Sequence, residues 1–178
     1  MEDIASREDV RTMNWSVQKS VLVKEAERIG FERFQVGYVD ERGGHAVGDV
    51  ISTTGDTANA GDRAFFKQAA AGISNISDVL FARIDLKMVI CVSAPIFSAK
   101  GEVIGVLTGV TAASLLNDLV NEINVENNGF CFVINQSGTK MTAVNYEDVE
   151  NAQNDITNSE GREAADGVEA ILADARYD

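Results

Sequence analysis

The sequence predicts an α+β fold in which a long N-terminal helix precedes antiparallel strands arranged in two related modules. Between residues 6 and 29, apolar residues recur at helical spacing. The apolar runs that follow are short and are separated by polar turns with glycine, which is typical of strands. Residues 34–44 and 130–138 repeat one outline, an apolar strand followed by a polar turn and a glycine, and this favours two modules over one.

The N-terminal helix is expected to begin at residues 6–9, Ser-Arg-Glu-Asp, where a hydroxyl can cap it and carboxylates suit the helix dipole. Val10, Met13 and Val17 lie on one stripe, and Gly30 is a natural end. Two interpretations stay open. The helix either packs only on its own domain, or it is a stalk that also carries dimer contacts.

Strands and one short helix are expected after this segment. Residues 48–61 are polar and rich in Gly and Thr, which predicts a loop. Asp62 is placed to cap a helix that runs through Ala71 and ends at Gly72. The expected strands of the first module cover residues 34–39, 79–84, 87–94 and 102–111.

A second helix is expected over residues 112–123, with Leu115, Leu116, Leu119 and Val120 on one face. The strand pattern then restarts. Strands are expected at 130–135 and 140–144 around a turn at 136–139, and a last helix at 160–175.

Composition excludes several classes of partner. The chain has 178 residues and a formal net charge of −13 at pH 7, which disfavours nucleic acid and anionic membrane surfaces. No run approaches the roughly 20 apolar residues of a membrane helix. Acidic residues occupy the place of a signal peptide's positive region, so we expect either a cytosolic protein or a fragment from between missing segments.

The cysteines and the single histidine do not predict a metal centre. Cys91 and Cys131 each lie in an apolar, strand-like run, which indicates buried core thiols. A disulfide between them is the alternative and requires Cα atoms within about 7 Å. There is no Cys-x-x-Cys pair and only one histidine, so no metal site is expected. Sequence motifs of nucleophilic, metal-dependent or phosphoryl-transfer enzymes are missing, and we therefore predict no catalytic residues.

Four motifs, in order, resemble the double Cache family of extracytoplasmic sensor domains. After the long helix come Val-Gly-Tyr-Val-Asp-Glu-Arg-Gly at 36–43 and Asp-Arg-Ala-Phe-Phe at 62–66. Ser-Ala-Pro-Ile at 93–96, with Gly-Glu-Val-Ile-Gly-Val at 101–106, resembles the family's Ser-x-Pro hairpin and its following strand. Residues 130–138 resemble the opening strand of the second, membrane-proximal module.

The resemblance implies two PAS-like modules stacked along a long helix, in a receptor with flanking membrane helices that are missing here. Residues 1–33 would be a stalk helix, 34–111 the membrane-distal ligand-binding module, and 112–178 a connecting helix with a membrane-proximal module that looks truncated. Relatives of this kind belong to chemoreceptors, sensor histidine kinases and cyclic-dinucleotide enzymes. A homodimer through the N-terminal helix is a further expectation.

The resemblance also directs attention to one candidate ligand residue. Arg63 follows the family motif, where its guanidinium fork would hold a ligand carboxylate. A local salt bridge, for example to Asp56, is the alternative. The amino-acid-binding subfamily has a Tyr before an Arg-x-Trp-Tyr and an Asp near the end of the last distal strand. This chain has neither, so an anion without an ammonium group is expected.

The other candidate ligand residues are aromatic or polar. Phe65 and Phe66 point about 100° apart on a helix, so at most one is expected to face the pocket. Phe81, Arg83 and Asp85 alternate on an expected strand and would share one face, although Arg83 as a surface cation is an equal alternative. Ser93 is a further candidate, with a structural role in the hairpin as its alternative.

The predicted function is therefore extracytoplasmic sensing of a small organic anion, such as a carboxylate, by a non-catalytic domain without a cofactor. Ligand binding in the distal module would shift an equilibrium between two arrangements of the receptor. The alternative is a cytosolic PAS- or GAF-like regulatory domain that binds a cofactor.

Overall fold

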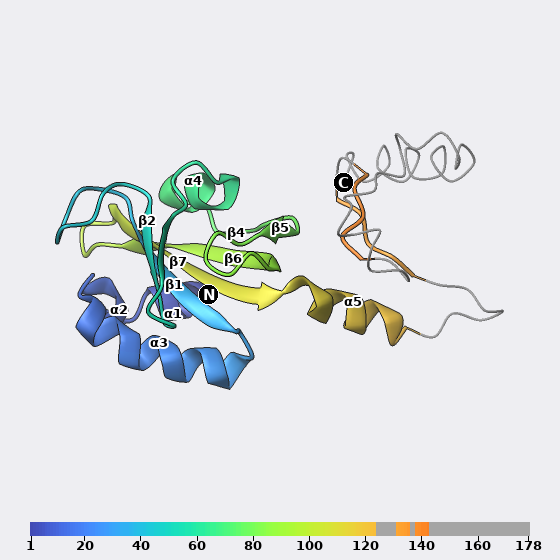
Figure 1. Ribbon diagram of the computed structural model, residues 1–178. Helices are drawn as coiled ribbons and strands as arrows, with labels where there is room; N and C mark the ends of the chain where they lie inside the picture. The colour runs from blue at the N-terminus through green and yellow to red at the C-terminus, as the bar shows by residue number, and fades with distance from the viewer. Residues whose placement is uncertain (124–130, 136–137, 143–178) are drawn as a thin grey trace. The chain divides into compact units, whose positions relative to one another are not determined.

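The computed structural model describes residues 1–123, 131–135 and 138–142. The chain divides into two compact units, Met1–Ala112 and Ala113–Asp178. The first unit is an α+β domain in which helices cover both faces of an antiparallel sheet (Figure 1). Short N-terminal helices lie against one face and helix α4 lies against the other, so this part of the predicted fold class is confirmed.

The strands that the structure describes form one sheet, in the order β3-β2-β1-β7-β6-β4, with β5 also paired to β6. Every pairing is antiparallel. The two longest strands, β6 and β7, make the Ser-x-Pro hairpin. Their bounds are β1 Arg33–Tyr38, β2 Asp49–Ser52, β3 Thr57–Asn59, β4 Asn75–Ile76, β5 Leu80–Phe81, β6 Met88–Phe97 and β7 Val103–Ala112.

Strand β1 lies between β2 and β7 and is buried along its whole length. Side chains alternate across a strand, so successive residues of β1 point to opposite faces of the sheet. Phe34 and Val36 enter the apolar cluster under the N-terminal helices. Arg33 and Gln35 point to the opposite face, where α4 (Ala64–Ala70) contributes Phe65 and Phe66 to a second cluster.

The predicted single helix over residues 6–29 is wrong. Three helices occupy the N-terminus: α1 (Glu2–Ala5), α2 (Glu8–Arg11) and α3 (Trp15–Ile29). The break follows from Met13, whose φ of 51° is left-handed, and from Asn14, whose side chain accepts a hydrogen bond from the Ser16 N–H at 3.1 Å. The predicted end at Gly30 is confirmed, with φ of 80°.

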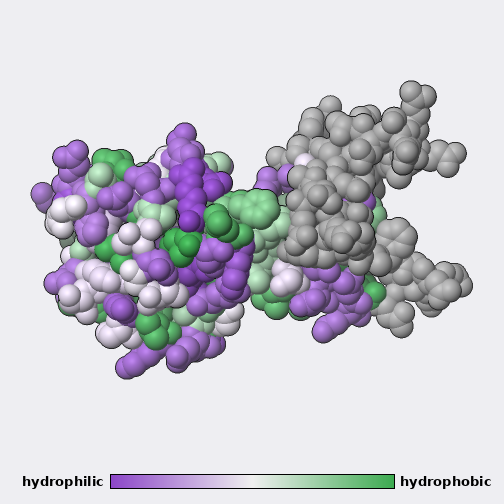
Figure 2. All heavy atoms as spheres, viewed as in Figure 1, coloured by the Kyte–Doolittle hydropathy of each residue, from purple (hydrophilic) through white to green (hydrophobic). Residues whose placement is uncertain are grey.

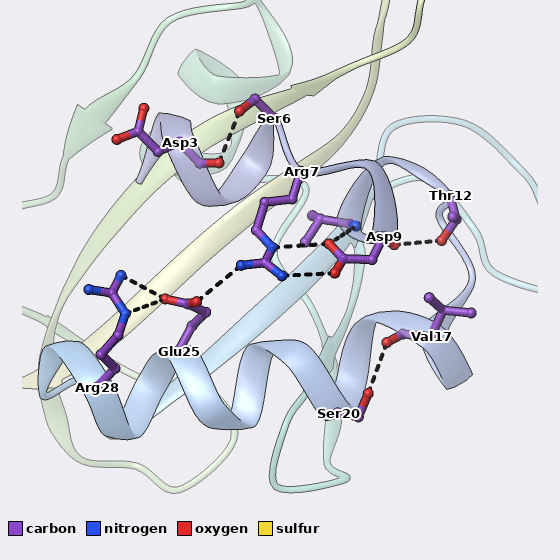
Figure 3. Close-up of polar contacts among 10 residues, drawn as sticks. Asp3, Ser6, Arg7, Asp9, Thr12, Val17, Ser20, Glu25 and Arg28 are labelled. Atoms are coloured by element: carbon purple, nitrogen blue, oxygen red, sulfur yellow. Dashed lines mark hydrogen bonds and ion pairs between the residues drawn. The ribbon is translucent and has the colours of Figure 1, made fainter.

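Ion pairs hold the short helices together on the outer side (Figure 3). Arg7 contacts Asp9 at 3.0 Å and Glu25 at 3.2 Å, and Arg28 reaches the same Glu25 at 2.7 Å. Hydrogen bonding from Arg7 is the main reason that the pKa of Asp9 is lowered. Glu25 therefore ties α3 back to the beginning of α2.

The predicted loop over residues 48–61 is also wrong, because it contains β2 and β3. Both are short, and β3 is an edge strand with a polar sequence, so its composition resembles a loop. Helix α4 is confirmed, but its cap is not Asp62. Arg63 occupies the N-cap position without a capping side chain, and Asp62 lies just outside the helix.

The predicted strand over residues 79–84 shortens to Leu80–Phe81, since residues 83–85 form a turn. Arg83 and Asp85 therefore do not share a strand face with Phe81, as the alternation had predicted. The predicted strands at 34–39, 87–94 and 102–111 are confirmed as β1, β6 and β7 with slightly different ends. Strand β4 was not predicted.

In the second unit, the predicted helix is confirmed as α5 (Ala113–Asn121). The apolar residues of its predicted face differ in burial: Leu115 and Leu119 are exposed, whereas Val120 is buried, as is Asn117. Residues 131–135 and 138–142 contain a β-bridge between Ile134 and Lys140. The described residues therefore show an isolated bridge in place of the predicted strands at 130–135 and 140–144. Residues 143–144 and the predicted helix at 160–175 lie outside the described residues.

Figure 2 shows that polar side chains dominate the visible face of the first unit, with small apolar groups between them. None of the helices in the described part of the chain is long and apolar enough to cross a membrane. Cys91 is buried, as predicted, whereas Cys131 is only partly buried; both are free thiols.

Candidate functional site

A small cavity of about 30 Å³ lies on the α4 side of the sheet. This volume has room for one or two water molecules. The cavity is lined by side chains from the sheet, from the start of α4 and from the turn after β5. They are Arg33, Gln35, Val50, Ala58, Asn59, Ala60, Arg63, Phe65, Leu80, Phe81, Ala82, Arg83, Ile84, Val89, Cys91 and Val110.

One cross-strand row and one residue of the next row make the floor of the cavity. Arg33, Val110 and Cys91 are register partners across β1, β7 and β6, and all three line the cavity. In the next row, Gln35 lies opposite Thr108, and the hydroxyl of Thr108 is 3.0 Å from that of Ser93. The alternation of strand side chains thus brings a guanidinium and an amide to the same floor.

Arg33 is a buried cation, with only 4% of its side chain exposed. Its guanidinium donates to both carboxylate oxygens of Asp85, at 2.8 and 3.3 Å, and lies 3.7 Å from the half-exposed Glu32. Burial raises the pKa of Asp85, but the hydrogen bonds and charge of Arg33 outweigh burial and lower it overall. The Arg33 Nε has no hydrogen-bond partner among the described residues.

Arg63 lies at the N-terminal end of α4 and lines the cavity. Its Nη2 donates to the carbonyl oxygen of Phe81 at 3.0 Å. The predicted alternative, an ion pair with Asp56, does not form; among the described residues, no carboxylate pairs with Arg63. Asp56 instead accepts a hydrogen bond from the hydroxyl of Thr54. Arg63 therefore contributes a positive charge to the cavity and forms no ion pair with the described residues.

Arg83 closes the rim of the cavity. Both of its terminal nitrogens donate to Asp62 at 2.6 Å, and one also donates to the carbonyl oxygen of Asn59 at 2.6 Å. The hydrogen bonds from Arg83 are the main cause that lowers the pKa of Asp62 to about 2. Together with the contact from Arg63 to Phe81, this pair fastens residues 59–63 to residues 81–83.

Four of the seven predicted site residues line the cavity, namely Arg63, Phe65, Phe81 and Arg83. Of the two phenylalanines on α4 only Phe65 does so, as their 100° separation predicts, while Phe66 packs over Gly37. The other two predicted residues lie behind the cavity wall. Asp85 holds Arg33, and Ser93 hydrogen-bonds to Thr108 in the sheet.

Sequence reasoning missed Arg33, Gln35 and Cys91 as cavity residues. Arg33 lies at the end of the N-terminal segment, and no sequence motif distinguishes it from arginines that lie on the surface. A signal for Gln35 was present, since it is the polar residue that interrupts the apolar run 34–39. Its burial to 7% exposure identifies it as unusual only once the fold is known.

The cavity has little capacity for covalent or metal chemistry. Burial is the main reason that the pKa of the Cys91 thiol is raised to about 11, so the thiol is protonated at neutral pH. Within residues 1–123, 131–135 and 138–142, metal-ligating side chains do not gather in groups of three. The arrangement of cations and amide suits the binding of an anion.

Solved ligand-binding domains of bacterial chemoreceptors have the same fold. The domain of Pseudomonas fluorescens CtaA in complex with L-serine aligns with a TM-score of 0.68 at 15% identity, over 86% of this chain and 64% of that domain. The domain of Pseudomonas aeruginosa PctC in complex with GABA aligns at 0.65 and 16% identity, over 86% and 66%. The Campylobacter jejuni Tlp3 domain in complex with 4-methylisoleucine aligns at 0.64 and 17% identity, over 83% and 59%.

The chain has the double Cache fold. The predicted resemblance is thereby confirmed at the level of structure. The chain spans less than two thirds of the length of these double Cache domains. No protein-family model matches the sequence, and no curated protein is significantly similar to it.

Proposed function

We propose that this chain is the extracytoplasmic sensor region of a transmembrane receptor and binds a small organic anion, a carboxylate, in the cavity of its first unit. The observation that carries the proposal is the charge of the cavity wall. Among the described residues, three arginines line it and no aspartate or glutamate does. Asp85 and Glu32 contact Arg33, and Asp62 contacts Arg83, whereas no described carboxylate forms an ion pair with Arg63.

Because Arg63 forms no ion pair with a described residue, its guanidinium can bind a ligand carboxylate through charge-assisted hydrogen bonds. The related domains were solved with amino acids or GABA. An ammonium group in this cavity would meet arginines and no lining carboxylate. The proposed ligand is therefore a carboxylate without an amine, and the domain does not act as an enzyme.

The cavity must widen to admit such a ligand, since small-molecule sites usually measure about 300–1,000 Å³. We propose that residues 81–85 move, and this would break the polar contacts that join them to residues 59–63 across the rim. Opening and closing of this segment would provide two states with different ligand affinity. Receptor signalling by this domain requires such a difference.

The proposal assigns residues 34–111 to the membrane-distal, ligand-binding module and residues 112–178 to a connecting helix and part of the membrane-proximal module. Residues 1–33 would form the stalk at whose surface two copies meet. Membrane helices of the full receptor would flank the chain. The output domain of that receptor, such as a methyl-accepting domain, histidine kinase or cyclase, would lie on the cytoplasmic side.

A thermal-shift screen with carboxylates, amino acids, amines and purines tests the proposal. A carboxylate at about 100 times its Kd should stabilise the folded chain by about 2.7 kcal/mol. Arg63→Ala should weaken its binding about 10- to 100-fold, because a charge-assisted contact is lost. Lys67→Ala is the matched control, since Lys67 is an exposed cation on the same helix that does not line the cavity.

Equal binding to Arg63→Ala and wild type would refute the site, and stabilisation by amino acids alone would refute the ligand class. Visible absorbance from a co-purified chromophore would point instead to a cytosolic, cofactor-binding regulatory domain. Light scattering at several concentrations would test the dimer separately.

A further inference from the structure

Two β1 side chains that line the cavity each carry a polar group without a hydrogen-bond partner among the described residues. The Arg33 Nε is buried and donates to no described atom. The Gln35 side chain is 7% exposed and lines the cavity, yet its amide makes no hydrogen bond with the described residues. Buried polar groups are nearly always hydrogen-bonded, and leaving one unpaired costs stability. The Arg33 Nε is such a buried group, and the unpaired Gln35 amide on the same floor is open to the same hydrogen-bond partner.

Their chemistry specifies the missing group. Nε–H of arginine only donates, whereas a glutamine amide both donates and accepts. A hydroxyl can accept from Arg33 and donate to Gln35, so it satisfies both. An ammonium would face the Arg33 cation, and a second carboxylate would lie near Asp85, which already neutralises Arg33. An uncharged hydroxyl suits this floor better than either.

From this juxtaposition we infer that the ligand is a small hydroxycarboxylic acid, with its carboxylate on Arg63 and its hydroxyl on Arg33 and Gln35. Arg33 and Gln35 are thus specificity-determining residues that recognise the hydroxyl. The inference rests on the proposed function and narrows its ligand class. It concerns the hydroxyl of the ligand, whereas the proposed function concerns the carboxylate.

Calorimetric titration with matched pairs of acids tests the inference. Lactate and propionate differ by one hydroxyl, as do 3-hydroxybutyrate and butyrate. At least one hydroxy acid should bind ten times or more tightly than its partner, because a site built for a hydroxyl rejects the analogue that lacks it. Pyruvate, whose carbonyl can only accept, should bind between lactate and propionate. Alanine, which carries an ammonium at the same position, should bind more weakly than lactate.

Gln35→Met keeps the size of the side chain and removes the amide. It should reduce the preference for the hydroxy acid over the plain acid to less than threefold. Gln68→Met is the matched control, since Gln68 is exposed on α4 outside the cavity. Arg33→Lys keeps a cation near Asp85 but removes Nε, and it should reduce the same preference.

The outcomes separate this inference from the proposed function. Equal affinity for both members of each pair in the wild type would overturn the hydroxyl assignment and leave the carboxylate site standing. A preference that persists in Gln35→Met and in Arg33→Lys would overturn the roles of these residues. Failure of every carboxylate to bind would overturn both proposals. The wild-type comparison does not depend on any variant folding.

Discussion

Arg33 on β1 donates two hydrogen bonds to Asp85, which lies in the turn between β5 and β6, 52 residues away in the sequence. The pair joins the floor of the cavity to the segment that closes its rim. Arg33 is almost fully buried, while a quarter of the Asp85 side chain is exposed. The Asp85 carboxylate therefore offsets the desolvation cost of burying the Arg33 guanidinium.

Asp85→Ala should destabilise the domain by about 3 kcal/mol, because it leaves a buried guanidinium without its partner. Urea unfolding of the variant and the wild type measures the difference. Glu27→Ala, at an exposed position of α3, should change stability by less than about 0.5 kcal/mol. A similarly small change for Asp85→Ala would show that Arg33 finds compensation elsewhere.

The contact between Asp62 and Arg83 should depend on pH. The pKa of Asp62 is lowered to about 2, chiefly by hydrogen bonding from Arg83, from an ordinary value of 3.8. A lowered pKa means that the folded state prefers the charged carboxylate. The pair therefore stabilises the fold above pH 4, and this contribution is lost as the pH falls towards 2.

Thermal melts of wild type and Asp62→Asn at several pH values measure this dependence. The wild type should melt higher at about pH 5, and the difference should shrink towards about pH 2 as Asp62 gains a proton. Other carboxylates titrate in both proteins, so their effects on the melting temperature cancel in the difference between the two. A difference that stays constant over this range would contradict the assignment.

Gly37→Ala should destabilise the domain by about 1–3 kcal/mol through overpacking. A Cβ at this position would lie 2.5 Å from the Phe66 ring and 3.2 Å from Val50 Cγ1, and all three residues are buried. Phe66→Leu should relieve the clash. The double variant should then be more stable than the sum of the two single effects predicts, and simple additivity would show that the ring moves aside without cost.

Cys91 should react slowly with thiol reagents at about pH 8, because its pKa is raised to about 11 and the thiolate is the reactive form. Labelling of Cys131→Ser with a disulfide reagent should be at least tenfold slower than labelling of Cys91→Ala. Unfolding in urea should remove the difference. Rapid labelling of Cys91 in the folded chain would indicate that the cavity opens often.

The strands with strong apolar patterns could be predicted from the sequence. β1, β6 and β7 combine apolar runs with turn residues at their ends, and these signals are local. Short edge strands such as β3 were missed because pairing with a neighbour, and not composition, makes them strands. The helix break at Met13 was missed because the apolar stripe continues across it.

The cavity was only partly predictable. Arg63 and Phe65 are two residues apart in one motif, so the local sequence identifies both as candidate site residues. Arg33 became a site residue through its register with Val110 and Cys91, and through the distant Asp85. Sequence spacing cannot show which strands are neighbours in a sheet. The set of side chains that meet in the cavity depends on that strand order.

Burial of β1 on both faces has a mechanical consequence. Its odd-numbered residues Arg33 and Gln35 line the cavity, and its even-numbered residues Phe34 and Val36 pack beneath the N-terminal helices. These four side chains share one extended backbone that cannot flex between them without breaking ladder hydrogen bonds to β7. A backbone displacement on the cavity side would therefore also move Phe34 and Val36, which belong to the same apolar cluster as Leu22 and Ala26 of α3. Strand β1 thus connects the cavity directly to the packing of the N-terminal helices.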